Sequence, residues 1–204
     1  MEYRPAKSDD GEKQTGAIDL EKISSESRKI FEGEESSILP SLLKLGGSPG
    51  GARPKILVSL QESKSGGITI RSDDDNPPSG FSHWLIKFIG KGDEAHDSLI
   101  EFQYMQAARN AGLSVPEHKL FGEGKNKYFG VRRFDRGINN EKLHVHSLAG
   151  LMHSDFRTPA FDYKDLLKVA VLLTAMYSER DMAFRLAVFN VIFHNRDDHS
   201  KNFS

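Results

Sequence analysis

The segment HNRDDHSKNFS, residues 194–204, decides how the rest of the chain is interpreted. It places Asp197 five residues before Asn202, directly after an apolar stretch, residues 183–193, that has helical periodicity. In phosphoryl-transfer enzymes of the kinase type, an aspartate orients or accepts the proton of the attacking hydroxyl, and an asparagine five residues later supplies an oxygen ligand to Mg²⁺. The segment fits the pattern RDxxxxN and also the variant order DxHxxN. Either pattern predicts chemistry on ATP.

The composition sets broad limits on the class of protein. With 204 residues the chain is long enough for one sizeable domain or two small ones. Lys and Arg number 28 against 29 Asp and Glu, for a net charge of −1, so bulk charge does not favour binding to nucleic acid or to anionic membranes. The absence of cysteine excludes disulfides, zinc–thiolate sites and a cysteine nucleophile. Without a long apolar run or a signal peptide, we expect a cytoplasmic protein.

The N-terminal third leads into a glycine-rich segment. Residues 1–17 are polar and predict a flexible lead-in, and two short helices are expected at 19–33 and 36–45. The sequence LGGSPGGARPKILVSL, residues 45–60, then predicts a tight turn that leads into a strand. Glycines let backbone N–H groups approach phosphate oxygens, and Arg53 and Lys55 add positive charge. The spacing alone leaves a phosphate cradle and a plain turn equally open, and the pattern at 194–204 favours the cradle.

A lysine and a glutamate occupy positions that suit nucleotide binding. FSHWLIKFI, residues 81–89, predicts a strand that carries Lys87, and residues 97–112 predict an amphipathic helix that contains Glu101. A strand lysine that follows a glycine-rich loop can hold nucleotide phosphates, and a helix glutamate can fix that lysine in an ion pair. The alternative is that both side chains are merely solvated. The predicted core face of this helix consists of Leu99, Ile100, Tyr104, Ala107, Ala108 and Ala111.

The remaining elements complete the predicted fold. A short strand at 68–70 and further strands at 115–121 and 128–137 are expected, and backbone groups around Arg133 and Phe134 would meet an adenine edge. From Leu143 the chain is expected to be helical. One helix over 162–176 is predicted to be buried on most sides and another spans 181–194. The fold class predicted is α+β, a two-lobed protein-kinase-like fold. Its predicted parts are a lead-in at 1–17, a strand-rich N-terminal lobe at 18–137 and a helical C-terminal lobe at 138–204.

Several motifs together resemble one known family, the HipA-type serine/threonine kinase toxins of bacterial toxin–antitoxin systems. The resemblance covers roughly residue 40 to the end. The motifs that carry it occur in the family's order with compatible spacing: GGSPGGARPK (46–55), WLIKF (84–88), AARNAGLSVP (107–116), RRFDRG (132–137), LHVHSLAGLMHSDFRTPAFDYKDLL (143–167) and FNVIFHNRDDHSKNFS (189–204).

The resemblance implies roles for individual residues and for the protein. Asp197 corresponds to the catalytic base, Asn202 to a Mg²⁺ ligand, Lys87 to the phosphate-binding lysine and Glu101 to its partner. The ATP-binding glycine-rich loop corresponds to Gly50, Gly51, Ala52, Arg53 and Lys55. Some members carry an autophosphorylated serine in this loop, for which Ser48 is the nearest candidate. The family implies ATP and Mg²⁺ as cofactors, a small DNA-binding, HipB-like antitoxin as partner, and protein substrates such as aminoacyl-tRNA synthetases.

The same resemblance implies parts that do not appear in this sequence. Family members have a β-rich subdomain before the matching segment, and they carry helices and a second metal-binding aspartate after the catalytic loop. We therefore expect a fragment with little kinase activity of its own. An alternative is a non-catalytic subunit, either antitoxin-binding or completed by a second chain. The residue types of HNRDDH also suit a metal-dependent nuclease, but a second carboxylate cluster and a basic run are missing.

Overall fold

The computed structural model describes residues 19–24, 54–64, 67–72, 76–89, 94, 96–122, 124, 127–155 and 161–204. The predicted lead-in, the helix at 36–45 and the glycine-rich loop lie outside these residues; that loop contains Ser48, Gly50, Gly51, Ala52 and Arg53. The labelled elements are β1 (Lys55–Glu62), β2 (Ile68–Ser72), β3 (Ser82–Lys87), α3 (Asp97–Asn110), β4 (His118–Phe121), β5 (Tyr128–Arg132), η1 (Ile138–Asn140), α4 (Leu148–Leu151), α5 (Tyr163–Thr174) and α6 (Tyr177–Ile192). A mixture of helices with an antiparallel sheet is thus confirmed.

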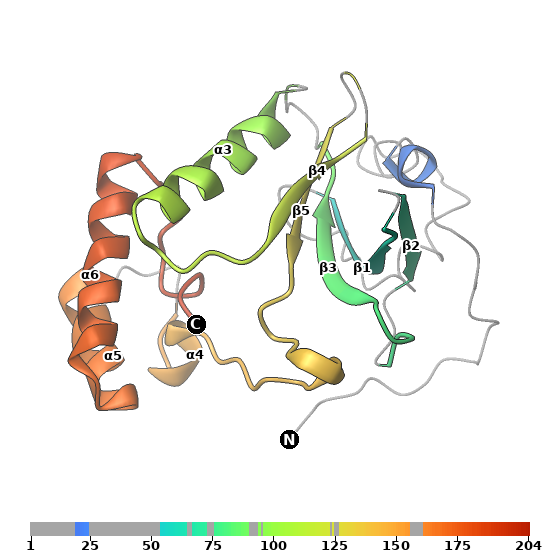
Figure 1. Ribbon diagram of the computed structural model, residues 1–204. Coiled ribbons are helices and arrows are strands. Elements are labelled where there is room, and N and C mark those ends of the chain that lie inside the picture. The colour runs from blue at the N-terminus through green and yellow to red at the C-terminus, as the bar shows by residue number, and fades with distance from the viewer. Residues whose placement is uncertain are drawn as a thin grey trace. The chain divides into compact units, whose positions relative to one another are not determined.

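The five strands form one sheet in the order β2-β1-β3-β5-β4, and every neighbouring pair is antiparallel (Figure 1). The strands β1 and β3 place β-branched and aromatic residues, Ile56, Val58, Trp84 and Ile86, on the face that is buried in the core. The register places Lys55 opposite Lys87, and Lys87 opposite Phe129. Side chains alternate between the two faces of a strand, so these three residues share one face.

The other face of the sheet carries the main hydrophobic core. Ile56 and Ile86 face each other across β1 and β3, and Val58 faces Trp84. Trp84 is 1% exposed, and its ring meets Phe121 edge to face with 5.8 Å between centroids. Ile23 packs into the same core from a helical turn at residues 20–24. The cluster comprises Ile23, Ile56, Val58, Leu60, Ile70, Trp84, Ile86, Phe88, Phe121 and Tyr128.

The predicted core face of helix α3 is partly wrong. Ile100 and Tyr104 are 40% and 41% exposed, and Ala111 also lies on the surface, whereas Ser98 and Ala108 are buried. The helix is rotated so that Glu101 reaches Lys87 on the sheet. A glutamate on the inner side displaces the apolar stripe that periodicity alone would select.

The chain divides into two compact units. The first comprises the residues up to Phe102 together with Pro116–Glu141, and the second comprises Gln103–Val115 together with Lys142–Ser204. Unit 1 therefore contains the sheet and the start of α3. Unit 2 contains the rest of that helix with α4, α5 and α6.

In unit 2, α5 and α6 pack against each other. Asp162 caps α5 in a capping box with Asp165, as the sequence DYKD suggests. The prediction that α5 is buried on most sides is wrong, because Val169 is its buried residue while Leu172 and Leu173 are 81% and 65% exposed. Among the described residues, α6 is the element that packs most extensively on this helix, and a helix covered mainly on one side buries one stripe.

Two predicted helix boundaries also differ. α6 begins at Tyr177 rather than near residue 181, directly after Ala175 ends α5 in a left-handed conformation. The helical region expected from Leu143 contains in fact the four-residue helix α4, capped by the Ser147 hydroxyl. Within the described ranges, no helix is long and apolar enough to cross a membrane.

Candidate functional site

The sheet face that carries Lys87 holds an ion pair. Lys87, at the end of β3, is paired with Glu101 of α3, as predicted. Their side chains are 33% and 24% exposed, and the Lys87 ammonium lies 5.6 Å from the centroid of the Phe129 ring. An ion pair that is partly buried over an aromatic ring is more fixed in its orientation than a fully solvated ion pair. The glutamate and the ring thus fix the direction of the ammonium group.

Lys55 adds a second positive charge beside this pair. It begins β1 and lies directly opposite Lys87 in the ladder. Like charges that face each other across two strands are unfavourable unless an anion or a carboxylate lies near them. Two lysines and one glutamate sum to a charge of +1 at this end of the sheet. That balance suits a site that binds an anion.

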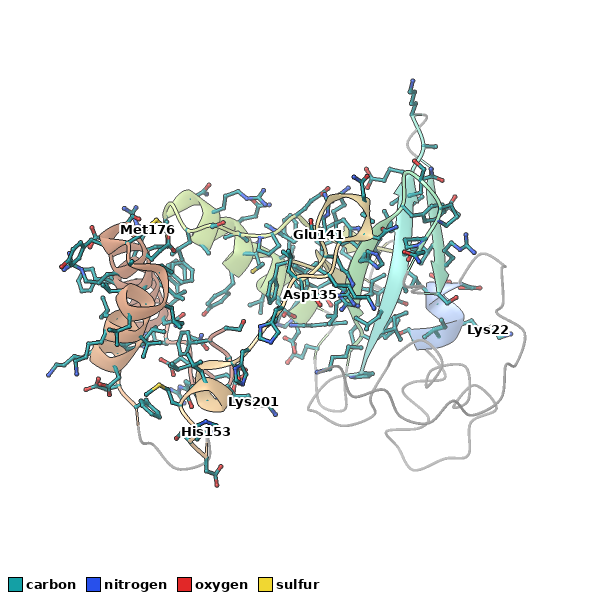
Figure 2. The ribbon with its side chains drawn as sticks, turned by 90° about the horizontal axis from the view of Figure 1, so that it is seen from below. Lys22, Asp135, Glu141, His153, Met176 and Lys201 are labelled. Carbon is teal, nitrogen blue, oxygen red and sulfur yellow. The ribbon has the colours of Figure 1, made fainter. Side chains whose placement is uncertain are left out.

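The segment after β5 differs from the predicted hinge in one respect. The Arg133 N–H donates to the His83 carbonyl oxygen at 2.9 Å, so it serves the sheet and does not meet an adenine edge. The Arg133 guanidinium donates to both carboxylate oxygens of Asp135, at 2.9 and 2.7 Å, and Phe134 is 60% exposed. Figure 2 labels Asp135 in this segment. An adenine contact here would rely on backbone groups other than that N–H.

Asp135 has a pKa below its ordinary value. The main cause is its hydrogen bonds from Arg133, and Arg136 lies beside the same carboxylate, with Nη1 2.7 Å from Oδ2. A depressed pKa means that Asp135 stabilises the fold above its unfolded-state pKa, near 4, and that this contribution disappears as the pH falls through the lower folded value. We therefore expect Asp135→Asn to lower the urea midpoint at pH 7 and to have progressively less effect as the pH falls below 4. A constant difference between the two proteins from pH 7 to pH 3 would contradict this expectation.

The loop at 194–204 brings Asp197 and Asn202 together. The Asn202 side-chain nitrogen donates to the Asp197 carbonyl oxygen at 2.5 Å, so the side-chain oxygen is the atom suited to a metal. The Asp197 side chain is 81% exposed, and His199 Nε2 lies 3.2 Å from its Oδ1. The Asp197 N–H donates to Asn195 Oδ1 at 3.0 Å. The predicted base is therefore accessible to solvent while its backbone is held.

Two residues that sequence reasoning missed anchor this loop. The Tyr163 hydroxyl, at the start of α5, bonds to the Asp198 carboxylate, and burial together with Asp198 raises the pKa of this tyrosine. Asn190 of α6 is 6% exposed and accepts from Asn195 through both its side-chain oxygen (3.2 Å) and its backbone oxygen (2.9 Å). An asparagine inside the apolar run 183–193 was the available signal for the second anchor.

The α4 helix anchors the end of the same loop. The Leu148 N–H donates to the Phe203 carbonyl at 2.8 Å, and the Ala149 N–H donates to the Ser200 carbonyl at 3.0 Å. The rings of Tyr163 and Phe203 meet edge to face at 6.3 Å. N–H groups at the start of a helix lack partners within it. The loop carbonyls supply those partners, so loop and helix stabilise each other.

The two adjacent aspartates should respond differently to substitution. Asp198→Ala removes the partner of the Tyr163 hydroxyl, so we expect a loss of about 1–2 kcal/mol of unfolding free energy. Asp197→Ala removes an exposed carboxylate, so we expect a change of less than about 0.5 kcal/mol. Urea unfolding of both variants measures this difference. Equal losses would show that Asp198 does not anchor the loop.

The metal-binding capacity of the loop is limited. In the part of the chain that the structure describes, no group of three or more His, Cys, Asp or Glu side chains is placed to hold a metal ion. The Asn202 and Asp197 oxygens are nevertheless ligands of the kind that Mg²⁺ prefers, and Mg²⁺ commonly uses one or two protein oxygens and completes its shell with phosphates and water. The residues fit an ion that arrives with a nucleotide.

The described residues form an α+β protein whose antiparallel sheet carries a lysine–glutamate ion pair and whose helical unit carries a loop with an accessible aspartate. The chain belongs to the HipA family, because residues 47–204 match the HipA-like C-terminal domain. It is also similar in fold to a chain in the Shewanella oneidensis MR-1 complex of the toxin–antitoxin proteins HipA and HipB with operator DNA, at a TM-score of 0.53 and 20% identity. That likeness covers 76% of this chain and 39% of the other, so this chain spans less than half of it. No curated protein matches the sequence.

Proposed function

We propose that this protein is a HipA-like serine/threonine kinase component with a two-lobed, kinase-like arrangement, acting in the cytoplasm. In the proposal, unit 1 binds Mg-ATP and the loop of unit 2 supplies the base for phosphoryl transfer to a protein hydroxyl. The observation that carries it is the Lys87–Glu101 ion pair. A lysine held in this way beside a second lysine is suited to the phosphates of a nucleotide.

The neighbouring residues of the same sheet face suit the nucleotide base. Leu57, Leu85 and Val131 lie opposite one another across β1, β3 and β5, and all three are half-buried. They form the row next to the one that contains Lys55 and Lys87. An apolar row beside two cations provides a floor for a flat ring and a positive end for phosphates.

The chemistry assigned to the loop is proton removal and positioning. The Asp197 carboxylate would accept the proton of a serine or threonine hydroxyl as its oxygen bonds to the γ-phosphorus. The bond from that phosphorus to the β–γ bridging oxygen breaks, and ADP leaves. Mg²⁺ neutralises the developing phosphate charge when it is bound, with Asn202 as a protein ligand. The hydrogen bonds of Asn195 and Asn202 with the backbone of Asp197 keep this base in position.

The proposal assigns the loop one metal ligand, Asn202, and one base, Asp197, and no second metal-binding carboxylate, so we expect a low rate of turnover for this chain by itself. Loss of one group that neutralises transition-state charge typically lowers kcat by roughly a hundredfold or more. The same observation favours a second candidate function, a non-catalytic subunit that binds an antitoxin or is completed by another chain. In either case we propose a small DNA-binding, HipB-like antitoxin as the partner. For the kinase we propose a protein substrate such as an aminoacyl-tRNA synthetase.

Thermal unfolding with Mg-ATP tests the proposal. A ligand present at a hundred times its Kd stabilises a protein by about 2.7 kcal/mol, so binding raises Tm by several degrees. We expect a rise with millimolar Mg-ATP and a smaller rise with ATP in excess EDTA. No rise with Mg-ATP would leave the non-catalytic subunit as the function. Co-purification with a second chain, together with an absent rise, would support that candidate directly.

A further inference from the structure

Three neighbouring aromatic rings link the two members of the Lys87–Glu101 pair. His118 lies in the middle, with its ring centroid 5.3 Å from that of Phe102 in an edge-to-face contact and 6.3 Å from that of Phe129 in a tilted one. Phe102 follows Glu101 in α3, and Phe129 lies beneath the Lys87 ammonium. This row of three rings thus begins beside Glu101 and ends under Lys87, and all three rings belong to unit 1.

The His118 ring is buried and held by one hydrogen bond. It is 6% exposed, and Nδ1 lies 2.8 Å from the Pro116 carbonyl oxygen, so Nδ1 carries the proton and donates it. Nε2 is buried and has no hydrogen-bond partner among the residues described. A buried polar atom without a partner costs free energy. The Nδ1 hydrogen bond and the contacts of the ring faces and edges, rather than Nε2, therefore hold this histidine in position.

Those contacts set the position of α3 on the sheet. β4 and β5 hold His118 and Phe129 through the ladder, in which His118 lies opposite Val131 and Phe129 lies opposite Lys87. Phe102 meets the sheet by resting on His118. If the ring at 118 is removed, Phe102 loses this support and Glu101 is no longer held over Lys87. A cavity left by an aromatic ring is only partly refilled by its neighbours.

We propose that His118 is a positioning residue that holds Glu101 against Lys87 and so sets the phosphate site; its effect on nucleotide binding rests on the proposed function. The effect of His118 on the ion pair does not rest on the proposed function, because the ion pair exists without nucleotide. Phe121 provides a matched control. It lies on the same strand, is 4% exposed, and faces the core on the opposite side of the sheet.

The first test measures the ion pair itself, without nucleotide. The coupling between Lys87→Met and Glu101→Gln in urea unfolding is determined in the wild type and in three backgrounds: His118→Ala, His118→Phe and Phe121→Leu. We expect the coupling to fall to about half or less in His118→Ala and to persist in the other two backgrounds. His118→Phe retains a ring at position 118. Phe121→Leu lowers stability but leaves the rings at positions 102, 118 and 129 unchanged. An undiminished coupling in His118→Ala would overturn the proposal.

The second test separates phosphate binding from base binding. Calorimetric titration with Mg-ATP and with adenosine compares ligands that do and do not reach Lys87. We expect His118→Ala to weaken Mg-ATP binding about tenfold more than it weakens adenosine binding, while His118→Phe retains both affinities. Equal weakening for both ligands would refute a role at the phosphates. A wild-type protein that binds no Mg-ATP would refute the proposed function, whereas the coupling measurement would still decide the role of His118.

Discussion

Replacing Lys87 with methionine is expected to remove most of the stabilisation by Mg-ATP. Hydrogen bonds to charged groups are worth about 1.5–3 kcal/mol each, which corresponds to a roughly ten- to hundredfold weaker affinity. The fold itself should lose no more than about 1 kcal/mol, because the Lys87 and Glu101 side chains are partly exposed, at 33% and 24%. The measurement is the rise in Tm over a range of Mg-ATP concentrations for the wild type and for Lys87→Met.

Lys119 supplies the matched control for that experiment. Its side chain is 29% exposed, it is ion-paired with Glu62 and Glu117, and its ammonium lies 5.4 Å from the Trp84 ring centroid. It resembles Lys87 in exposure and in its contacts, but it lies on the core side of the sheet. We expect Lys119→Met to lower Tm slightly and to leave the Mg-ATP response unchanged. If both variants lose the response equally, Lys87 has no specific role at the phosphates.

The ion pair was predictable because each of its members follows from a local pattern. A run of consecutive apolar and aromatic residues locates the strand that ends at Lys87, and a 3.6-residue period locates the helix that contains Glu101. The rotation of that helix was not predictable. Periodicity selected Ile100 and Tyr104 for the core, but both are partly exposed, while Glu101 pairs with the sheet and the Tyr104 hydroxyl donates to the Phe193 carbonyl oxygen. A polar contact across the fold can override the apolar stripe, and local sequence does not report it.

The anchors of the loop at 194–204 show a second limit. Tyr163 and Asp198 are 35 residues apart, and neither residue type indicates the other. The spacing of Asp197 and Asn202 is local and can be predicted from the sequence, whereas the support of the loop depends on tertiary contacts. The apolar run of α5 has the same limit. Its composition shows that the helix can be buried, but Leu172 shows that burial also requires a neighbour on that side.

Gly130 is the position at which a single added methyl group should do the most damage to the sheet. It lies at the centre of β5, opposite Ile86 on β3 and Lys119 on β4. A Cβ atom at Gly130 would lie 2.2 Å from Cε2 and 2.9 Å from Cδ2 of the Phe121 ring, which are impossible contacts. The ring is 4% exposed and packs edge to face on Trp84, so it has no free space to enter. We expect Gly130→Ala to lower the unfolding free energy by about 3 kcal/mol.

A second substitution shows whether the ring is the cause. In Phe121→Leu the side chain is smaller and the overlap is relieved, so Gly130→Ala should cost about 1–2 kcal/mol less in that background than in the wild type. Urea unfolding of the two single variants and the double variant gives this difference. Strictly additive losses would mean that Gly130 is required for another reason. β5 also holds Phe129 opposite Lys87, so Gly130→Ala should weaken Mg-ATP binding as well. The double variant should recover part of the stability and part of the Mg-ATP binding.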